Sequence, residues 1–310
     1  MTTVAYLGPP GTFTEEALLT QADLAESDLC EYPSMPEVLL AVAAGQVDLG
    51  FVAVENAIEG TVNATLDTLI FETDLYIQRE VVLPVHQHLL ARPGTQLSDV
   101  TTIVSIPVAA GQCRSFFRSN LPGAAEMAAT STAEAARMVG EGRTPPGSAA
   151  VGTVLAAKLY GLEVVAHEIE DHPDNATRFV LVALPDYGIP PPSGHDRSSI
   201  VCFQYSDRPG SLHAILGQFS ARGINLTKLE SRPTKRGLGD YCFIIDLEGH
   251  IADELVADAL RELHASLAEV KFLGSYPAAG PHGDARRAEA ETAWREAEEW
   301  MSGLRSRLRR

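Results

Sequence analysis

The stretch that most constrains the fold lies at residues 185–194, Pro-Asp-Tyr-Gly-Ile-Pro-Pro-Pro-Ser-Gly. Four prolines and two glycines in ten residues stop regular structure, as they do in linkers between domains. The chain has 310 residues, which is too many for one compact core of common size. We therefore expect a larger domain before this linker and a smaller one after it.

Composition and charge narrow the classes of function. The chain is 45% hydrophobic and 21% charged, which is typical of a globular protein. No signal peptide is apparent, and no run approaches the ~20 apolar residues of a membrane span. The net charge of -17 argues against nucleic acid as a partner, because phosphate binding needs clustered Lys and Arg. We therefore expect a cytoplasmic protein with neither a membrane nor a nucleic-acid partner. The four scattered cysteines then indicate reduced thiols rather than disulfides or a zinc site: Cys30, Cys113, Cys202 and Cys242.

Before the linker, apolar strand-like runs alternate with helix-like segments in two groups. The first group fills residues 4–70 and the second fills residues 102–167. Residues 75–92 read as extended strands that leave the first group, and the strand at 178–184 is expected to return to it. This pattern predicts two α/β lobes with the chain crossing between them twice, and a ligand cleft between the lobes.

Polar side chains follow or precede predicted strands at three places. A Gly-Pro-Pro-Gly-Thr turn at residues 8–12 follows the first strand and starts a helix. Glu55 and Asn56 follow a buried strand, and Asn-Ala-Thr-Arg at residues 175–178 leads into the closing strand. Ligands of open α/β sheets bind at strand ends, so these places are expected to face the cleft. The helix start at Thr12 is an anion site in principle, although a simple helix cap is the commoner meaning of such a turn.

His86 and His88 stand two residues apart on one face of a predicted strand. Histidines occur at this spacing in metal sites, but no third ligand stands out nearby. We therefore expect no metal, with a metal pair as the alternative.

After the linker the pattern changes to a small βαββαβ unit, followed by a tail. The expected strands and helices, in chain order, are residues 198–205, 209–222, 225–232, 239–247, 252–265 and 268–276. The tail carries apolar residues at helical spacing, which predicts a solvated helix, or one packed on the protein, rather than a membrane helix.

The motifs resemble, in this order, those of the bacterial prephenate dehydratases of phenylalanine biosynthesis. They are Gly-Pro-Pro-Gly-Thr-Phe at 8–13, Val-Glu-Asn-Ala-Ile-Glu-Gly at 54–60 and Asn-Ala-Thr-Arg-Phe at 175–179. The last unit resembles an ACT regulatory domain, since Pro-Gly-Ser-Leu at 209–212 and Glu-Ser-Arg-Pro at 230–233 are similar to that domain's phenylalanine motifs. The resemblance implies a periplasmic-binding-protein-like, two-lobed α/β catalytic domain, followed by an α+β, ferredoxin-like ACT domain.

The resemblance also implies domain boundaries. These are a catalytic domain at 1–186 (lobe 1 at 1–75 and 176–186, lobe 2 at 76–175), a linker at 187–196, an ACT domain at 197–276 and a tail helix at 277–310.

The implied reaction converts prephenate to phenylpyruvate, water and carbon dioxide without a cofactor. Thr177 is similar to the family's essential threonine, and Asn56 with Glu55 to its active-site amide and carboxylate. The residues implied to bind substrate are Thr12, Phe13, Thr14, Gln112, Arg178 and Phe179. Gln112 falls in a helix predicted over 109–120, after an Ile-Pro-Val where the family often has His-Pro-Gln. Arg178 either holds a substrate carboxylate or makes a structural ion pair.

Regulation is implied as well, through L-phenylalanine bound between two ACT domains of a homodimer or homotetramer. Ser211 stands where alanine is commoner. The implied effector residues are Gly210, Ser211, Leu212, Asn225, Leu226, Glu230, Ser231, Arg232 and Pro233.

Three other readings stay open. A solute-binding protein shares the two-lobed fold, but it is usually exported and needs no regulatory domain. An amino-acid-sensing regulator is the second, although the chain has no basic DNA-binding helix. Within the enzyme class, arogenate could replace prephenate as the substrate.

Overall fold

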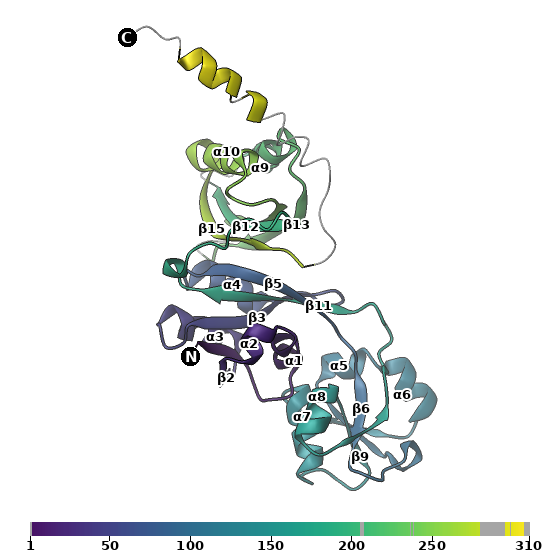
Figure 1. Ribbon diagram of the computed structural model, residues 1–310. Helices are drawn as coiled ribbons and strands as arrows, with labels where there is room; N and C mark the ends of the chain where they lie inside the picture. The colour runs from purple at the N-terminus through teal and green to yellow at the C-terminus, as the bar shows by residue number, and fades with distance from the viewer. Residues whose placement is uncertain are drawn as a thin grey trace. The chain divides into compact units, whose positions relative to one another are not determined.

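The computed structural model describes residues 2–204, 208–235, 237, 239–279, 295–297 and 299–306. The chain forms two compact units (Figure 1). Unit 1 contains Met1–Thr73 and Val81–Val182, and unit 2 contains Asp74–Glu80 and Ala183–Arg310. Each unit is described by itself.

The first lobe of unit 1 is built on a mixed sheet in the order β2-β1-β3-β11-β5, with β4 paired to β3. The first three strands are parallel to one another, and β11 is antiparallel to β3. The strands are β1 (Thr3–Leu7), β2 (Asp28–Tyr32), β3 (Leu49–Asn56), β4 (Gly60–Thr61), β5 (Tyr76–Pro84) and β11 (Ala176–Ala183). The helices are α1 (Phe13–Leu19), α2 (Ala22–Ala25), α3 (Met35–Ala43) and α4 (Asn63–Phe71). The continuous apolar run of β3 is buried, as its sequence predicts.

The second lobe has a mixed sheet in the order β10-β6-β9-β7-β8. Alternate residues of its strands face two separate apolar clusters, one with α5 and α6 and the other with α7 and α8. The sheet therefore lies between two helical layers. The strands are β6 (His88–Ala91), β7 (Thr102–Ser105), β8 (Ala125–Ala128), β9 (Ser148–Gly152) and β10 (Glu163–Ala166). The helices are α5 (Pro107–Gly111), α6 (Arg114–Asn120), α7 (Thr132–Gly140) and α8 (Val154–Leu159), with a 3-10 turn at Leu97–Asp99.

The single helix predicted over residues 109–120 is wrong in one respect, because the structure has two short helices there. The break falls at Gln112 and Cys113, which end α5 and begin α6. The carboxylate of Asp171 accepts from the backbone N–H of Ser115 in the first turn of α6, at 3.1 Å. The backbone N–H of Asp171 also donates to the carbonyl of Gln112, at 2.6 Å. A distant residue thus stabilises the break and places Gln112 at a helix end.

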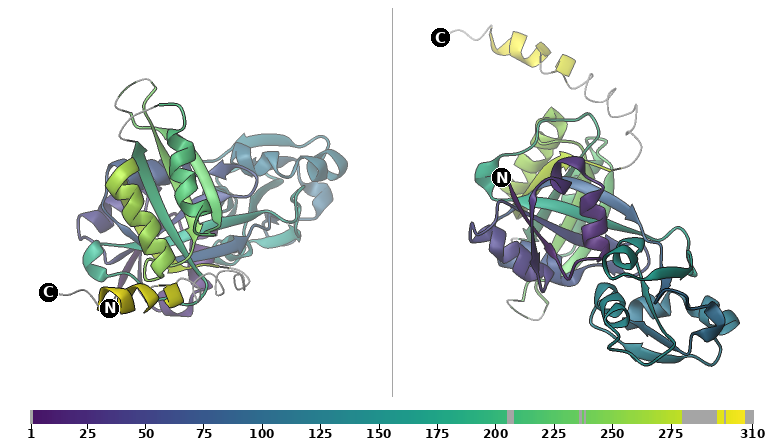
Figure 2. Two further views of the ribbon diagram at one scale, coloured as in Figure 1. Left: turned by 90° about the horizontal axis from the view of Figure 1, so that it is seen from above. Right: turned by 60° about the horizontal axis from the view of Figure 1, so that its bottom comes forward.

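The two predicted crossings between the lobes run beside each other (Figures 1 and 2). The outgoing chain after β5 donates from the N–H of Val85 to the carbonyl of Asn175, and Ile169 donates back to the carbonyl of Gln87, both at 2.8 Å. The expected return of the closing strand is confirmed, since β11 pairs with β3 of the first lobe.

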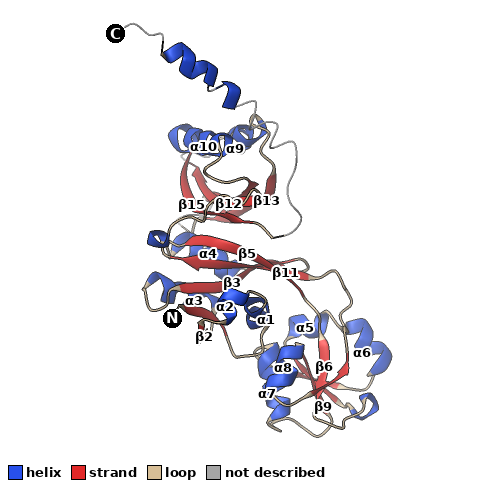
Figure 3. Ribbon diagram, in the orientation of Figure 1, coloured by secondary structure: helices blue, strands red, loops and turns tan. Residues whose placement is uncertain are grey.

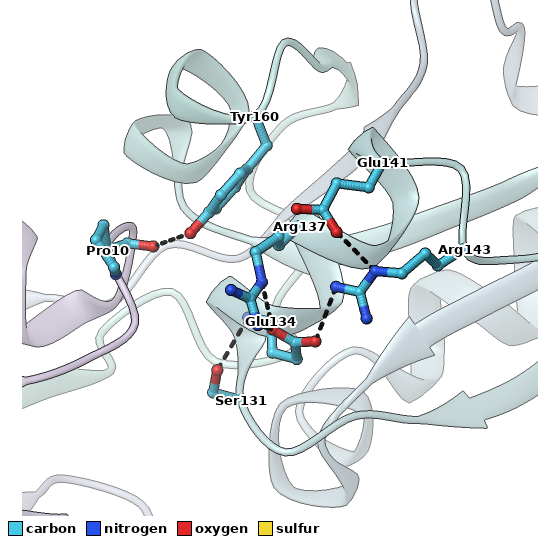
Figure 4. A network of polar contacts seen from close by, with 7 residues as sticks. All are labelled: Pro10, Ser131, Glu134, Arg137, Glu141, Arg143 and Tyr160. Atoms are coloured by element: carbon cyan, nitrogen blue, oxygen red, sulfur yellow. Dashed lines mark hydrogen bonds and ion pairs between the residues drawn. The ribbon is translucent and has the colours of Figure 1, made fainter. Parts of the chain in front are cut away.

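The lobes also touch where the turn after β1 meets α8. The hydroxyl of Tyr160 donates to the carbonyl of Pro10 at 2.6 Å, and the hydroxyl of Thr153 donates to the carbonyl of Gly11 at 3.0 Å. Figure 4 shows Tyr160 reaching toward Pro10, close to the α7 network of Ser131, Glu134, Arg137, Glu141 and Arg143. This turn is therefore fixed to both lobes.

Unit 2 contains an antiparallel sheet in the order β13-β14-β12-β15. Its two helices lie on one face of that sheet and enclose one apolar cluster with it (Figure 3). The elements are β12 (Asp196–Gln204), α9 (Ser211–Ser220), β13 (Leu226–Pro233), β14 (Tyr241–Glu248), α10 (Glu254–Glu262), a π-helical turn at Leu263–Leu267 and β15 (Ala268–Pro277). The predicted βαββαβ order is confirmed. The proline-rich stretch before it starts with a 3-10 turn at Pro185–Tyr187.

In the tail, residues 295–297 and 299–305 are helical. Trp300 is 65% exposed and Leu304 is 41% exposed, so neither is covered by the protein's own core. The rest of the predicted tail helix, including residues 280–294 and 307–310, lies outside the described residues. None of the helices in the described part of the chain is both long and apolar enough to cross a membrane.

Candidate active site

The ends of β3 and β11 bring two of the predicted catalytic residues into contact. Their antiparallel register sets Thr177 opposite Asn56 and Arg178 opposite Glu55. The side-chain amide of Asn56 lies 2.9 Å from the hydroxyl oxygen of Thr177. Residues separated by more than a hundred positions in the sequence therefore form one polar pair at the edge of the sheet.

The direction of this hydrogen bond is fixed by the backbone. Asn56 Oδ1 faces the backbone N–H groups of Ile58 and Glu59, each at 3.0 Å, and only an oxygen can accept from them. The NH2 group of Asn56 must then face the other way, where Thr177 Oγ1 accepts from it. The proton of the Thr177 hydroxyl is not used in that bond, so it is available to a further acceptor.

Glu55 and Arg178 form an ion pair beside this contact, with Nη2 of Arg178 at 2.9 Å from Oε2 of Glu55. The arginine side chain is 14% exposed and the glutamate side chain is 39% exposed. Of the two alternatives for Arg178, a substrate contact and an ion pair within the protein, the structure contains the ion pair. A substrate carboxylate would share the guanidinium with Glu55.

Gln112 reaches the same cluster from the second lobe. Its amide nitrogen donates to the carboxylate of Glu59 at 3.1 Å, and its amide oxygen accepts from Asn175 at 3.3 Å. Asn175 in turn accepts from Asn56 at 3.0 Å. The sequence placed Asn175 and Glu59 in motifs, and it predicted that the stretch with Asn175 faces the cleft, but it named neither among the catalytic or binding residues. The signal was their position, since each stands within a few residues of a predicted strand end.

The start of α1 is a helix cap. The Thr12 hydroxyl donates to the carbonyl of Leu7 at 3.0 Å and accepts from the N–H of Glu15 at 3.3 Å. The carboxylate of Glu15 accepts from the N–H of Gly11 at 2.5 Å, so the chain's own carboxylate lies at the anion position of this turn. Burial, with the nearby Glu15, also raises the pKa of the Tyr6 hydroxyl.

The other predicted substrate-binding residues are buried or half-buried in the protein core. Thr14 is buried. Phe179 is 1% exposed and stacks on Phe51 with ring centroids 5.3 Å apart. Phe13 is half-buried at the first position of α1. Substrate binding by these residues and by Thr12 stays a prediction.

His86 and His88 make contacts with different residues. His86 Nδ1 lies 2.9 Å from Oε1 of Glu170, and Nδ1 of His88 accepts from the N–H of Glu168 at 3.2 Å. Burial, with His167 beside the ring, lowers the pKa of His88 and favours its neutral form. Within the described ranges, no group of three His, Cys, Asp or Glu residues could hold a metal ion.

The predicted effector residues gather on α9 and β13 of unit 2. Gly210 begins α9 with a φ of +89°, and among the described atoms nothing lies within 4 Å of a Cβ built on it. The Ser211 hydroxyl donates to the carbonyl of Arg208 at 2.7 Å. Asn225 donates to Glu248 at 3.0 Å, and Arg232 pairs with Glu230 at 3.2 Å. Leu226 and Pro233 are the two ends of β13. Leu212 packs against the apolar cluster, and Ser231 helps to line a hollow of about 460 Å³ with the ends of β12 and β14.

The fold and the cluster around Thr177 define a class: a two-lobed α/β protein with neutral hydrogen-bonding side chains gathered at the end of one sheet, joined to a separate βαββαβ domain. A family model described as prephenate dehydratase matches residues 4–186, and one described as ACT domain matches residues 198–265. The chain belongs to the prephenate dehydratase family, and it is a carbon–oxygen lyase.

Similar proteins agree over almost the whole chain. The chain is 42% identical to a prephenate dehydratase of Mycolicibacterium vanbaalenii over 97% of this chain and 98% of that protein. The crystal structure of prephenate dehydratase from Arthrobacter aurescens in complex with L-Phe is 38% identical, with a TM-score of 0.89 over 98% of this chain and 100% of that one. A structure described as GqqA, a novel type of quorum quenching acylases, is 31% identical, with a TM-score of 0.80 over 89% of this chain and 98% of that one. The predicted fold, family, enzyme class and reaction are thereby confirmed.

Proposed function

We propose that this prephenate dehydratase uses Thr177 as the donor to the departing hydroxyl of prephenate and Asn56 as the group that orients Thr177. The observation that carries the proposal is the hydrogen bond of 2.9 Å from Asn56 Nδ2 to Thr177 Oγ1. Its direction leaves the threonine proton available for the substrate.

The reaction breaks two bonds of the prephenate ring. The bond to the ring carboxylate breaks, carbon dioxide leaves, and the electron pair enters the ring. The C–O bond to the ring hydroxyl breaks, and the departing oxygen takes up a proton and leaves as water. Because the ring becomes aromatic, the products are strongly favoured. The enzyme therefore has to hold a dianion and help hydroxide to leave, and a positioned proton donor contributes about 10²–10⁴-fold to such a step.

Threonine is a weak acid, so Thr177 acts by its position and as a relay for a proton rather than through a matched pKa. Asn56 is suited to hold it, because its amide oxygen is fixed by two backbone N–H groups. Because the Thr177 oxygen accepts from Asn56, the proton of the Thr177 hydroxyl points away from Asn56. The role needs neither a nucleophile nor a cofactor.

The remaining predicted residues hold the substrate in this proposal. Gln112 faces the cluster from the second lobe with an amide that carries two donors, of which Glu59 takes one. Arg178 contributes a guanidinium whose charge is offset by Glu55, so that the pair adds donors without net repulsion of a dianion. In this proposal, Thr12, Phe13, Thr14 and Phe179 shape the predicted cleft near the ends of β1 and β11.

Feedback regulation by L-phenylalanine at the ACT domain completes the proposal. The Arthrobacter aurescens enzyme in complex with L-Phe, at 38% identity, supports it. The open backbone at Gly210 and the edge strand β13 supply the groups that an amino acid would need: backbone N–H donors and the polar side chains of Asn225 and Glu230. The effector then lies between two ACT domains and favours a less active state.

The proposal includes the setting of the enzyme. It works in the cytoplasm as a homodimer or homotetramer, with the domain boundaries expected from the sequence. Cys30, Cys113, Cys202 and Cys242 form no disulfide, which suits a reducing compartment.

The test is Thr177→Val, with Thr68→Val as the matched control. Thr68 is a threonine of the first lobe that is 2% exposed, whereas Thr177 is half-buried, and its hydroxyl donates within α4 to the carbonyl of Ala64 at 3.0 Å. Turnover of prephenate is followed as phenylpyruvate absorbance in alkali. Turnover of arogenate, which carries an amino group in place of the keto group, is followed separately as the phenylalanine that it would release. We expect kcat to fall by about 10²–10⁴-fold for Thr177→Val and to stay within about twofold for the control. Near-wild-type turnover of folded Thr177→Val would show that the assigned role is wrong.

A further inference from the structure

Four residues of unit 1 close a ring of hydrogen bonds next to Thr177. Asn56 Nδ2 donates to Asn175 Oδ1 at 3.0 Å, and Asn175 Nδ2 donates to Gln112 Oε1 at 3.3 Å. Gln112 Nε2 donates to Glu59 Oε1 at 3.1 Å, and the backbone N–H of Glu59 donates to Asn56 Oδ1 at 3.0 Å. Three side-chain amides are thus connected head to tail.

The ring has a single direction, and two independent groups impose it. At one end the backbone N–H groups of Ile58 and Glu59 require an acceptor, which makes the oxygen of Asn56 face them. At the other end the carboxylate of Glu59, when ionised, can only accept, which makes the NH2 group of Gln112 face it. Asn175 lies between them and can satisfy both neighbours in one orientation only.

We propose that Asn175 is a positioning residue for the dehydration, and that the carboxylate of Glu59 sets the direction of the ring. This inference rests on the proposed role of Thr177, because its consequence is that the Asn56 amide always presents its NH2 group to the threonine oxygen. Asn175 is 2% exposed and Gln112 is 8% exposed, so water does not replace a bond lost between them. A reversed amide in the ring would turn an oxygen toward its neighbour's oxygen.

The ring also crosses between the lobes. Glu59 follows β3 in the first lobe, whereas Gln112 ends α5 in the second. The bond between them is made only in an arrangement that brings these two ends within 3.1 Å. Orientation of Thr177 is thereby coupled to the relative position of the lobes.

The experiment moves the carboxylate from one end of the ring to its middle. Asn175→Asp makes the middle residue an acceptor only, so either Gln112 opposes it with an oxygen or Gln112 reverses and opposes Glu59 instead. Glu59→Gln alone keeps an oxygen that can accept from Gln112. It removes only the requirement that residue 59 be an acceptor, which fixes the direction of the ring. The double variant combines Asn175→Asp with Glu59→Gln. In it, the new amide at position 59 donates to the amide oxygen of Gln112, whose side chain has turned over, and the NH2 group of Gln112 donates to the new carboxylate at position 175. Every bond of the ring is satisfied again, and the total charge is that of the wild type.

We expect kcat with prephenate to fall by about 30-fold for Asn175→Asp and by less than about fivefold for Glu59→Gln. The double variant should recover at least about tenfold over Asn175→Asp, a coupling that simple loss of structure does not produce. Asn120→Asp and Glu72→Gln, which make the same chemical changes at exposed positions, should leave kcat within about twofold of the wild type. Circular dichroism and thermal unfolding show whether each variant is folded.

Three results would overturn the inference. They are wild-type kcat in Asn175→Asp, a double variant no more active than Asn175→Asp, or losses that appear only in KM. Thr177→Val measured alongside separates the two proposals. If it retains turnover, the assigned role of Thr177 fails whatever the ring does; if it loses turnover while Asn175→Asp does not, only the positioning role fails.

Discussion

Asn56→Asp should abolish most of the activity while leaving a folded protein, and the reason is the direction of one hydrogen bond. The substitution keeps the shape of the side chain and keeps an oxygen for the two backbone N–H groups of Ile58 and Glu59. It replaces the NH2 group that lies 2.9 Å from the Thr177 oxygen with a second oxygen. Thr177 then has to donate its proton to the new carboxylate, and the departing hydroxyl of the substrate loses its donor.

The magnitude has two parts. Loss of a positioned proton donor lowers kcat by about 10²–10⁴-fold. The new carboxylate also faces Asn175 Oδ1, and reversal of Asn175 only moves the clash to Gln112 or to Glu59, because the ring then contains one acceptor too many. The carbonyl of Ala176, which accepts from Asn56 Nδ2 at 3.3 Å, also faces the new oxygen. Opposed oxygens of this kind cost about 1–3 kcal/mol, and the charged bonds to the two N–H groups offset part of that cost. A 10²–10⁴-fold loss of kcat corresponds to about 3–5 kcal/mol of transition-state stabilisation, so the loss of stability is expected to be the smaller of the two.

The assay is phenylpyruvate release over a range of prephenate concentrations, with urea unfolding of the same samples. Asn120→Asp is the control, since it adds the same charge on the exposed side of α6. Its kcat should stay within about twofold of the wild type. If Asn56→Asp keeps kcat within about tenfold of the wild type and remains folded, Thr177 does not need a free proton, and the proposed orientation has no catalytic meaning.

Two further predictions concern the scaffold. Gly11→Ala should lower the free energy of unfolding by about 2–4 kcal/mol in a urea titration, because the residue has a φ of +94° and its new Cβ would lie 3.0 Å from the Cα and Cβ of Ala156. Gly45→Ala is the control, since this residue has a φ of +67° but open space among the described atoms. It should lower the free energy of unfolding by only about 1–2 kcal/mol. Burial raises the pKa of the Cys113 thiol to about 12, so at pH 8 mass spectrometry after brief iodoacetamide treatment should find Cys30 modified and Cys113 not, and equal labelling of both in the folded enzyme would contradict the buried position.

Local sequence was enough for elements whose ends are determined by their own residues. The helix at Thr132–Gly140 is an example, because Ser131 caps the N–H of Glu134 and both residues stand in the local sequence. The buried strand before Glu55 was equally clear from its uninterrupted apolar run. The break at Gln112 was not, because the group that caps α6 is Asp171, more than fifty residues away.

The candidate site divides in the same way. The motifs identified Asn56 and Thr177 as candidate residues. The prediction that the closing strand returns to the first lobe implied that both lie on the same sheet. The register that opposes them, and the pairing of Arg178 with Glu55, are properties of the folded sheet and could not be read from either strand alone. Asn175 was expected only to face the cleft with the rest of its motif, because its proposed positioning role depends on the direction of its two bonds, which is visible only when both partners are in place.

The net charge of the chain explains why direction matters so much at this site. A protein with a charge of -17 does not attract a dianion from a distance, and the nearest guanidinium to Thr177 in the sheet register, that of Arg178, is paired with a carboxylate. Stabilisation of the departing hydroxide then has to come at contact range from neutral dipoles, and a neutral amide helps or hinders according to which of its ends it presents. A side-chain amide can turn over by rotating about one bond, at little cost unless its neighbours prevent it. The ring through Asn175, closed by one carboxylate and two backbone N–H groups, makes that rotation cost a buried hydrogen bond wherever it occurs. The acidic composition that weakens long-range attraction is therefore compatible with the proposed mechanism, in which the site depends on the fixed orientation of a few uncharged groups rather than on its net charge.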